Sequence, residues 1–274
     1  GPDSQDAMRL RIKNAFDQFI DVRNKSDKQI AMLSRQMEID IAIDLKGYTT
    51  NSRPEIFALG AAPLQINYLG YPGTMGAEFI DYIIADKVLI PECNQSFFSE
   101  KIIYLKNSYQ VNDSKRQISN KHFTRSDFNL PETSFVFCCF NNNFKILPTT
   151  LDLWVRILSK VPNSVMWLLE DNPLAKENLI KQVENRGITK DRLIFAGRMD
   201  LPEHLARHRL ADLFLDTLPC NAHTTASDAL WAGLPVLTQL GETLAGRVAG
   251  SLLKAIDLRE LITHSQKGYE DLAD

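Results

Sequence analysis

The sequence predicts an α/β protein built around a doubly wound parallel sheet. Between residues 134 and 256, five strand-like apolar runs alternate strictly with five helix-like runs. The strand-like runs are almost wholly apolar, which is typical of strands covered by helices on both faces. At 274 residues the chain also exceeds the usual size of one domain, so two domains are expected.

The individual elements follow from periodicity and from capping residues. The first part is predicted to contain helices at residues 8–22 and 26–38 and strands at residues 39–45, 63–70, 81–86 and 101–105. Ser26 supplies the cap of the second helix. The later part is predicted to contain strands at residues 134–141, 164–170, 192–197, 212–217 and 235–241, and helices at residues 149–161, 173–187, 202–210, 225–233 and 243–256.

A polar stretch at residues 106–134 separates these two parts. It holds few periodic apolar residues and many turn formers, so a domain boundary is expected within it. We expect residues 1–118 to form the first domain and residues 119–274 the second. The Lys and Arg side chains of the stretch are expected to form a solvated linker face.

Composition excludes several classes of function. The net charge of -3 gives no general reason to expect nucleic acid or an anionic membrane as a partner. No apolar run approaches the roughly 18 residues that a membrane helix needs. The four cysteines form no CxxC pair, so a reducing cytoplasm is expected, with the cysteines as small buried apolar residues and no metal site.

The clearest candidate site follows the fourth strand of the second domain. Ligands of such sheets lie beyond the carboxyl ends of the strands, and here the segment CNAHTTASDALWAG leads into a helix. Its His223, Thr224 and Thr225 would join the free N–H groups of the helix start, which suits a diphosphate. Thr225 and Asp228 also match a capping box, which needs no ligand and leaves His223 and Thr224 unexplained.

Two other strand ends carry weaker candidates. The segment NNNFK, which includes Asn142 and Lys145, suits an anion, although an Asn-rich turn with a surface lysine is the simpler interpretation. His204 follows the third strand, where a lone histidine is usually a surface residue. Neither GxGxxG nor GxxxxGK[ST] is present, which disfavours dinucleotide and P-loop chemistry.

Four segments together carry a family resemblance. CNAHTTASDALWAG, LGYPGTMG, DLKGYTTNSRPEIFALGAAPLQ and FNNNFKILPTTLDLWVRILSKVPNSVMWLL resemble the catalytic region of the O-linked N-acetylglucosamine transferases in their bacterial form. The resemblance implies a GT-B fold of two Rossmann-like domains, the first incomplete at its amino terminus. It also implies a cytoplasmic enzyme that transfers N-acetylglucosamine, with inversion, from UDP-N-acetylglucosamine to Ser or Thr hydroxyls of proteins. A nucleotide sugar and a protein or peptide would be its partners, without a metal ion or other cofactor.

The resemblance assigns roles to the residues of the second domain. Lys145 would neutralise the distal phosphate as UDP leaves, and Asn142 would lie near the nucleotide. His223, Thr224 and Thr225 would hold the diphosphate.

The remaining implied residues contact the other parts of the donor. Asp228 would bind the ribose, and His204 with Met199 and Leu201 of the GRMDL loop would border the uridine. The sugar side would be lined by a turn of the first domain: Gly70, Tyr71 and Pro72.

An alternative class of function remains open. Relatives carry more of the first catalytic domain and helical repeats, so this chain alone is expected to bind UDP but to transfer sugar weakly or not at all. The alternative is a non-catalytic UDP-binding remnant of the fold or a partner-binding module.

Overall fold

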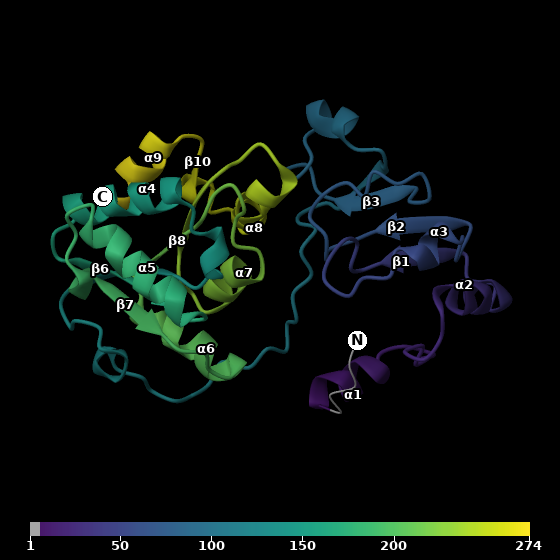
Figure 1. Ribbon diagram of the computed structural model, residues 1–274, viewed down its shortest axis with the longest axis horizontal. Helices are drawn as coiled ribbons and strands as arrows, with labels where there is room; N and C mark the ends of the chain where they lie inside the picture. The colour runs from purple at the N-terminus through teal and green to yellow at the C-terminus, as the bar shows by residue number, and fades with distance from the viewer. Residues whose placement is uncertain (1–5) are drawn as a thin grey trace. The chain divides into compact units, whose positions relative to one another are not determined.

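The structure is a computed structural model that describes residues 6–274 and contains two compact units (Figure 1). The first unit runs to Ile84 and includes Ser96–Ile103, and the second comprises Ala85–Gln95 and Tyr104–Asp274. Compared with the predicted limits of 1–118 and 119–274, the segments 85–95 and 104–118 lie in the second unit.

The first unit is a small parallel sheet with short helices. Its strands are β1 (Ile41–Asp44), β2 (Leu64–Asn67), β3 (Tyr82–Ala85) and β4 (Lys101–Tyr104), in the order β1-β2-β3-β4, and its helices are α1 (Ala7–Lys13), α2 (Asp27–Gln36) and α3 (Glu55–Ala58). All four predicted strands are confirmed. A core of Met75, Ala77 and Ile80 packs with the aromatic rings of Phe57 and Tyr71.

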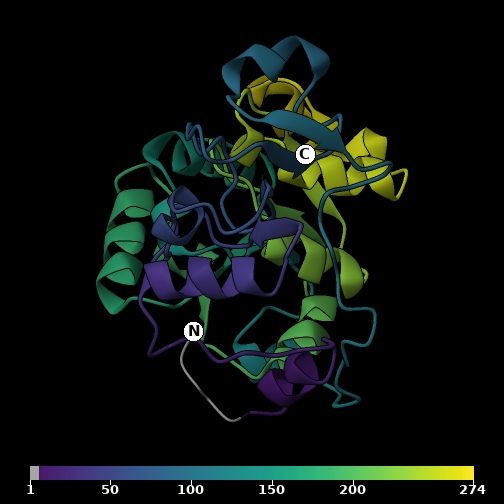
Figure 2. The same cartoon turned by 90° about the vertical axis from the view of Figure 1, so that its right-hand side faces the viewer.

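The two amino-terminal helices, purple in Figures 1 and 2, differ in how well the sequence predicts them. In α2, Ser26 and Gln29 form a capping box, which confirms the predicted cap. The first helix ends at Lys13, so the prediction that it extends to residue 22 is wrong. None of the α1 residues is buried, and without a core to pack on, a longer helix gains little stability.

The second unit carries the predicted doubly wound sheet. Its strands are β5 (Phe135–Cys139), β6 (Ser164–Leu169), β7 (Leu193–Ala196), β8 (Leu213–Leu215), β9 (Val236–Gln239) and β10 (Ile262–Thr263). Its helices are α4 (Pro148–Lys160), α5 (Pro173–Glu184), α6 (Leu201–Arg207), α7 (Thr224–Trp231), α8 (Val248–Ala255) and α9 (Gln266–Ala273). The sheet order is β10-β9-β8-β5-β6-β7, and all five neighbouring pairs of strands are parallel.

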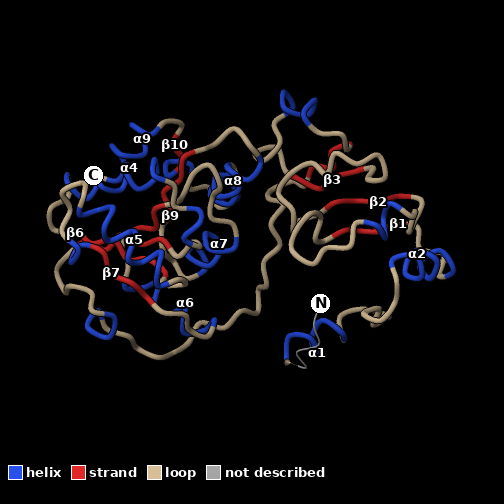
Figure 3. The backbone as a smooth tube through the Cα atoms, viewed as in Figure 1, coloured by secondary structure: helices blue, strands red, loops and turns tan. Residues whose placement is uncertain are grey.

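This strand order creates a switch point between β5 and β8. From β5 the chain proceeds to β6 and β7 on one side and then returns to place β8 on the other side of β5. Figure 3 shows strands of this sheet in red, with β9 and β10 near one end and β6 and β7 near the other. Connections that leave two neighbouring strands in opposite directions open a crevice at their carboxyl ends, where ligands of such sheets bind. In Figure 1, α4 and α9 lie next to each other, while α7 and α8 form a separate neighbouring pair.

Burial explains why the strands of this sheet are apolar. Val136, Phe137, Cys138 and Cys139 of β5 are fully buried, as expected for a central strand with helices on both faces. Burial raises the pKa of both thiols well above the usual range. The expectation of buried cysteines therefore holds for this pair, whereas Cys93 is exposed.

The polar stretch at residues 106–134 contributes two arginines to ion pairs within the second unit. Arg116 pairs with Asp228, with 11% and 9% of the two side chains exposed. Arg125 pairs with Asp212 at 2.8 Å and is 18% exposed. The prediction of a solvated linker face is wrong for these two arginines, because each side chain is largely buried against a carboxylate, of which Asp228 is buried and Asp212 is 36% exposed. Among residues 6–274, no helix is both long and apolar enough to cross a membrane.

Candidate functional site

The candidate site lies at the switch point of the second unit, where two loops leave adjacent strands. One loop follows β5 and carries Asn141, Asn142 and Lys145, and the other follows β8 and leads through His223 into α7. Because β5 and β8 pair in parallel, both loops leave the same edge of the sheet. The structure therefore brings together the candidates that the sequence places after the first and fourth strands.

Lys145 connects the two loops directly. Its Nζ donates a hydrogen bond of 2.6 Å to the main-chain oxygen of Asn221, three residues before α7 begins at Thr224. This bond holds a full positive charge beside the amino terminus of a helix. Two sources of positive potential thus lie next to each other at the crevice.

The amino terminus of α7 is open, and the capping-box interpretation of Thr225 and Asp228 is wrong. The N-cap residue is His223, and no side chain of the described residues caps the first turn. Thr225 lies inside the helix and donates its hydroxyl to Asn141 Oδ1, while the Asn141 amide donates to Thr217 Oγ1 at 2.8 Å. Thr224 is exposed at the first helical position. The N–H groups of the first turn and the Thr224 hydroxyl are therefore available to an anion.

His223 is neutral at physiological pH. Burial, helped by the charge of Lys145, lowers its pKa to about 4. Its Nε2 lies 3.1 Å from the carbonyl oxygen of Ala245, and because a carbonyl only accepts, the proton of the neutral ring belongs on Nε2. Nδ1 is then an acceptor, so His223 can donate to a phosphate only after it gains a second proton.

Asp228 lies on α7 as predicted, but it already has a partner. Arg116 Nη1 contacts its Oδ1, and Arg116 Nη2 lies 3.4 Å from Ser227 Oγ. Burial raises the pKa of Asp228, and Arg116 opposes the rise. The Arg116 guanidinium also lies 5.3 Å from the centre of the Trp231 ring. A ribose hydroxyl would have to share the Asp228 carboxylate with this arginine.

The third predicted strand end joins the site through an aromatic contact. The ring of His204 in α6 lies 5.3 Å from that of Phe140, which directly follows β5, and 4.7 Å from that of His208. Burial lowers the pKa of His204 to about 3, so its ring is neutral. In the loop before α6, Met199 is half-buried, and Leu201 is exposed at the first helical position.

Beneath His204 lies a buried arginine that sequence reasoning missed. Arg207 is fully buried, donates to the Gly197 carbonyl at 2.7 Å and lies 4.6 Å from the centre of the Phe140 ring. Its Nε and Nη2 find no partner among the described residues. The spacing of three residues between His204 and Arg207 did not indicate that Arg207 is buried, because pairs on the surface of a helix commonly have the same spacing.

The other predicted residues divide between the two units. Asn142 is exposed and precedes a short 3-10 turn that contains Lys145. Gly70, Tyr71 and Pro72 follow β2 in the first unit, where Tyr71 packs in the small core. A side chain at residue 70 would meet the Leu45 carbonyl oxygen at 2.1 Å, so only glycine fits the LGYPG turn there.

The described part of the second unit thus offers an anion site without an evident metal site. Lys145 supplies a charge and α7 supplies N–H donors at one crevice. No group of three or more His, Cys, Asp or Glu side chains within residues 6–274 has the arrangement to hold a metal ion.

Comparisons with known proteins agree with this architecture. The sequence pattern of glycosyl transferase family 41 matches residues 1–123 and 117–274. A protein of Arabidopsis thaliana, named as the probable UDP-N-acetylglucosamine–peptide N-acetylglucosaminyltransferase SEC, is 41% identical over 97% of this chain and 28% of its own length. A UDP-N-acetylglucosamine–peptide N-acetylglucosaminyltransferase of Caenorhabditis elegans is 29% identical over 97% of this chain and 33% of its own length. The chain therefore spans a third or less of these two relatives.

A solved structure confirms the fold. A mutant O-GlcNAc transferase from Thermobaculum terrenum superposes with a TM-score of 0.88 and 31% identity, over 98% of this chain and 51% of that one. The predicted GT-B fold is thereby confirmed.

Proposed function

Since this chain belongs to glycosyl transferase family 41, we propose that it is the UDP-binding part of a protein O-GlcNAc transferase. The reaction is transfer of N-acetylglucosamine from UDP-N-acetylglucosamine to Ser or Thr hydroxyls of proteins, with inversion at the sugar carbon. The partners are the nucleotide sugar and a protein or peptide acceptor. The names of the relatives and the charge arrangement of the crevice support this proposal.

One observation carries the proposal: Lys145 and the open end of α7 meet at the switch point of the sheet. A cation and a row of N–H donors suit the two phosphates of UDP. As the bond between sugar and phosphate breaks, negative charge grows on the departing UDP. Donors fixed in advance where that charge develops lower the barrier most effectively.

The residues of the crevice then take distinct roles. Lys145 neutralises the distal phosphate, while the α7 N–H groups and the Thr224 hydroxyl bind the diphosphate. The Thr225 hydroxyl binds it too, by turning from Asn141 Oδ1 to a phosphate oxygen. His223 also binds the diphosphate and gains a proton when the diphosphate enters the site, because a nearby negative charge favours the protonated ring. We propose that these groups balance the charge of UDP without a metal ion.

The rest of the donor would contact neighbouring residues. His204, held against Phe140, borders the uridine together with Met199, Leu201 and Asn142. The Asp228 carboxylate accepts hydrogen bonds from the ribose hydroxyls while it remains paired with Arg116.

The sugar side of the donor is assigned to the first unit. The residues of its LGYPG turn that we propose for this role are Gly70, Tyr71 and Pro72. Glycine at position 70 allows the backbone of the turn to approach other groups closely.

Calorimetry with the 274-residue chain tests the nucleotide assignment. We expect UDP to bind and to bind equally well in the presence of EDTA. A folded sample that fails to bind millimolar UDP would contradict the assignment, and tight binding of NAD instead would indicate an oxidoreductase. UDP binding in a longer form of the protein that never transfers sugar would favour the non-catalytic alternative.

A further inference from the structure

A buried carboxylate, Asp216, lies directly behind the crevice, and the roles proposed above do not include it. Asp216 follows β8 and is only 4% exposed. Its Oδ1 accepts hydrogen bonds from the N–H groups of Thr217 at 2.7 Å and Ala222 at 2.6 Å. Its Oδ2 accepts from the Thr238 hydroxyl of β9 at 2.7 Å. One carboxylate thus ties together both ends of the loop 217–222 and anchors them to the sheet.

The loop that Asp216 closes carries the acceptor of Lys145. Inside the loop, Thr217 Oγ1 donates to the Cys220 carbonyl at 2.7 Å, and the Asn221 amide donates to the Thr217 carbonyl at 2.9 Å. The Asn221 carbonyl accepts a hydrogen bond from Lys145 Nζ, and His223 is the residue directly after the loop. The position of the loop therefore fixes both the ammonium of Lys145 and the start of α7.

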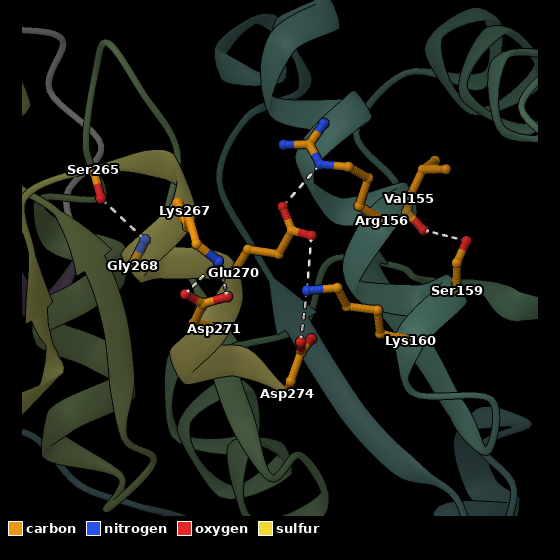
Figure 4. A network of polar contacts seen from close by, with 10 residues as sticks. All are labelled: Val155, Arg156, Ser159, Lys160, Ser265, Lys267, Gly268, Glu270, Asp271 and Asp274. Carbon is orange, nitrogen blue, oxygen red and sulfur yellow. Dashed lines mark hydrogen bonds and ion pairs between the residues drawn. The ribbon is translucent and has the colours of Figure 1, made fainter.

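A second support reaches the same residue from α9. Tyr269 is 1% exposed, and its hydroxyl donates to the main-chain oxygen of Asp216 at 3.0 Å. Figure 4 shows how α9 is held on α4: Glu270 accepts from Arg156 at 2.8 Å and pairs with Lys160 at 3.0 Å. The α9 helix thus holds the Tyr269 hydroxyl in position behind the loop.

We propose that Asp216 is a positioning residue of the UDP site. It holds the loop 217–222 in place and, through the Asn221 carbonyl, it holds the ammonium of Lys145 in position. Tyr269 supports it through the backbone. The expected effect of Asp216 on UDP binding rests on the proposed function. The expected effect of Asp216 on the loop 217–222 does not depend on any ligand.

Acceptor geometry, rather than the charge of Asp216, is what positions the loop. A negative charge so close to a diphosphate site would weaken anion binding, so a direct electrostatic role would be unfavourable. By contrast, the removal of the acceptor leaves two buried N–H groups without a partner and releases both ends of the loop. Asparagine keeps an acceptor oxygen, and because the Thr238 hydroxyl can accept as well as donate, its amide also finds a partner.

The test compares Asp216→Ala with Asp216→Asn in the 274-residue chain. We expect Asp216→Ala to weaken UDP binding about tenfold or more and to speed hydrogen exchange at the Ala222 N–H about tenfold or more without ligand. We expect Asp216→Asn to stay within about threefold of the unsubstituted chain in both measurements.

A matched control is Asp86→Ala. Asp86 is another buried carboxylate, 1% exposed, which accepts from three N–H groups and from the Ser251 hydroxyl. We expect this change to lower stability without changing UDP affinity or exchange at Ala222. If Asp216→Ala does not fold, Tyr269→Phe replaces it, with a smaller acceleration of exchange expected at Ala222.

The outcomes separate the inference from the proposed function. If the unsubstituted chain fails to bind UDP, the function is wrong, and hydrogen exchange alone still decides whether Asp216 controls the loop. Unchanged exchange at Ala222 in a folded Asp216→Ala or Tyr269→Phe protein would overturn the inference. An Asp216→Asn protein that binds UDP as weakly as Asp216→Ala would also overturn it, because charge rather than geometry would then act.

Discussion

Lys145→Met is the most direct test of the proposed site. Methionine keeps most of the apolar stem and removes the ammonium group that donates to Asn221 at 2.6 Å. In the free protein the change removes one partly buried hydrogen bond, which is worth about 1 kcal/mol of stability. The fold should therefore survive, and any larger effect should appear only with the nucleotide.

The expected magnitude follows from the charges involved. A unit charge about 4 Å from a phosphate charge is worth roughly 4 kcal/mol at an effective dielectric constant of about 20. Lys145 gives up its bond to Asn221 to reach the phosphate, so the net effect on bound UDP is smaller, about tenfold in affinity. In the transition state, charge accumulates on the departing UDP, and we expect kcat to fall about 100-fold or more, on the order of 2.7 kcal/mol.

Three measurements check this prediction. Calorimetry gives UDP affinity, and steady-state kinetics gives kcat in a form of the protein that transfers the sugar measurably. An NMR titration gives the pKa of His223, which Lys145 helps to lower to about 4 and which should therefore rise in Lys145→Met. An unchanged kcat would refute the phosphate role, and an unchanged His223 pKa would show that the ammonium does not lie beside the ring.

Three further predictions concern neighbouring groups. Thr225→Ala removes the hydrogen bond to Asn141, so we expect the free energy of unfolding, measured with urea, to fall by about 1 kcal/mol. We also expect UDP to bind more weakly; a loss of stability without a loss of UDP affinity would confine Thr225 to a structural role. UDP binding should take up protons near pH 6, measured by calorimetry in buffers of different ionisation enthalpy, and His223→Asn should abolish the uptake. Burial lowers the pKa of His208 to about 4, so the unfolded chain binds its proton first and stability falls from pH 6.5 toward pH 4. In His208→Asn this loss should shrink by roughly 3 kcal/mol, and an equal loss would contradict the assignment.

The sequence was sufficient to predict the sheet but not its smallest element. The strands near residues 135, 164, 193, 213 and 236 are long apolar runs between turn formers, which burial on both faces requires. The strand β10 contains only Ile262 and Thr263, and no periodicity can be read from two residues. Its position next to β9 is set by pairing with a distant segment.

The candidate site was predicted in part because its charged and capping residues follow strands in the sequence. Lys145 and His223 could be found from the rule that ligands bind beyond strand ends. Arg116 could not, because its partner Asp228 is 112 residues away and only the fold brings a polar stretch against α7. The sequence places Asp216 only near the end of a predicted strand, since nothing local shows that its carboxylate closes a loop six residues long.

The contacts of the free protein also explain how one lysine can serve both binding and departure of UDP. Its ammonium already lies beside α7, bonded to a neutral carbonyl rather than to a carboxylate, so a diphosphate can replace Asn221 without separating an ion pair. The nearby carboxylate of Asp216 is satisfied by Thr217, Ala222 and Thr238, and so leaves the ammonium free to turn. Had Lys145 paired directly with Asp216, its positive charge would be largely neutralised before the nucleotide arrived. The same separation lets the ammonium return to Asn221 when UDP leaves, since a carbonyl is an acceptor strong enough to order the side chain and weak enough to be exchanged.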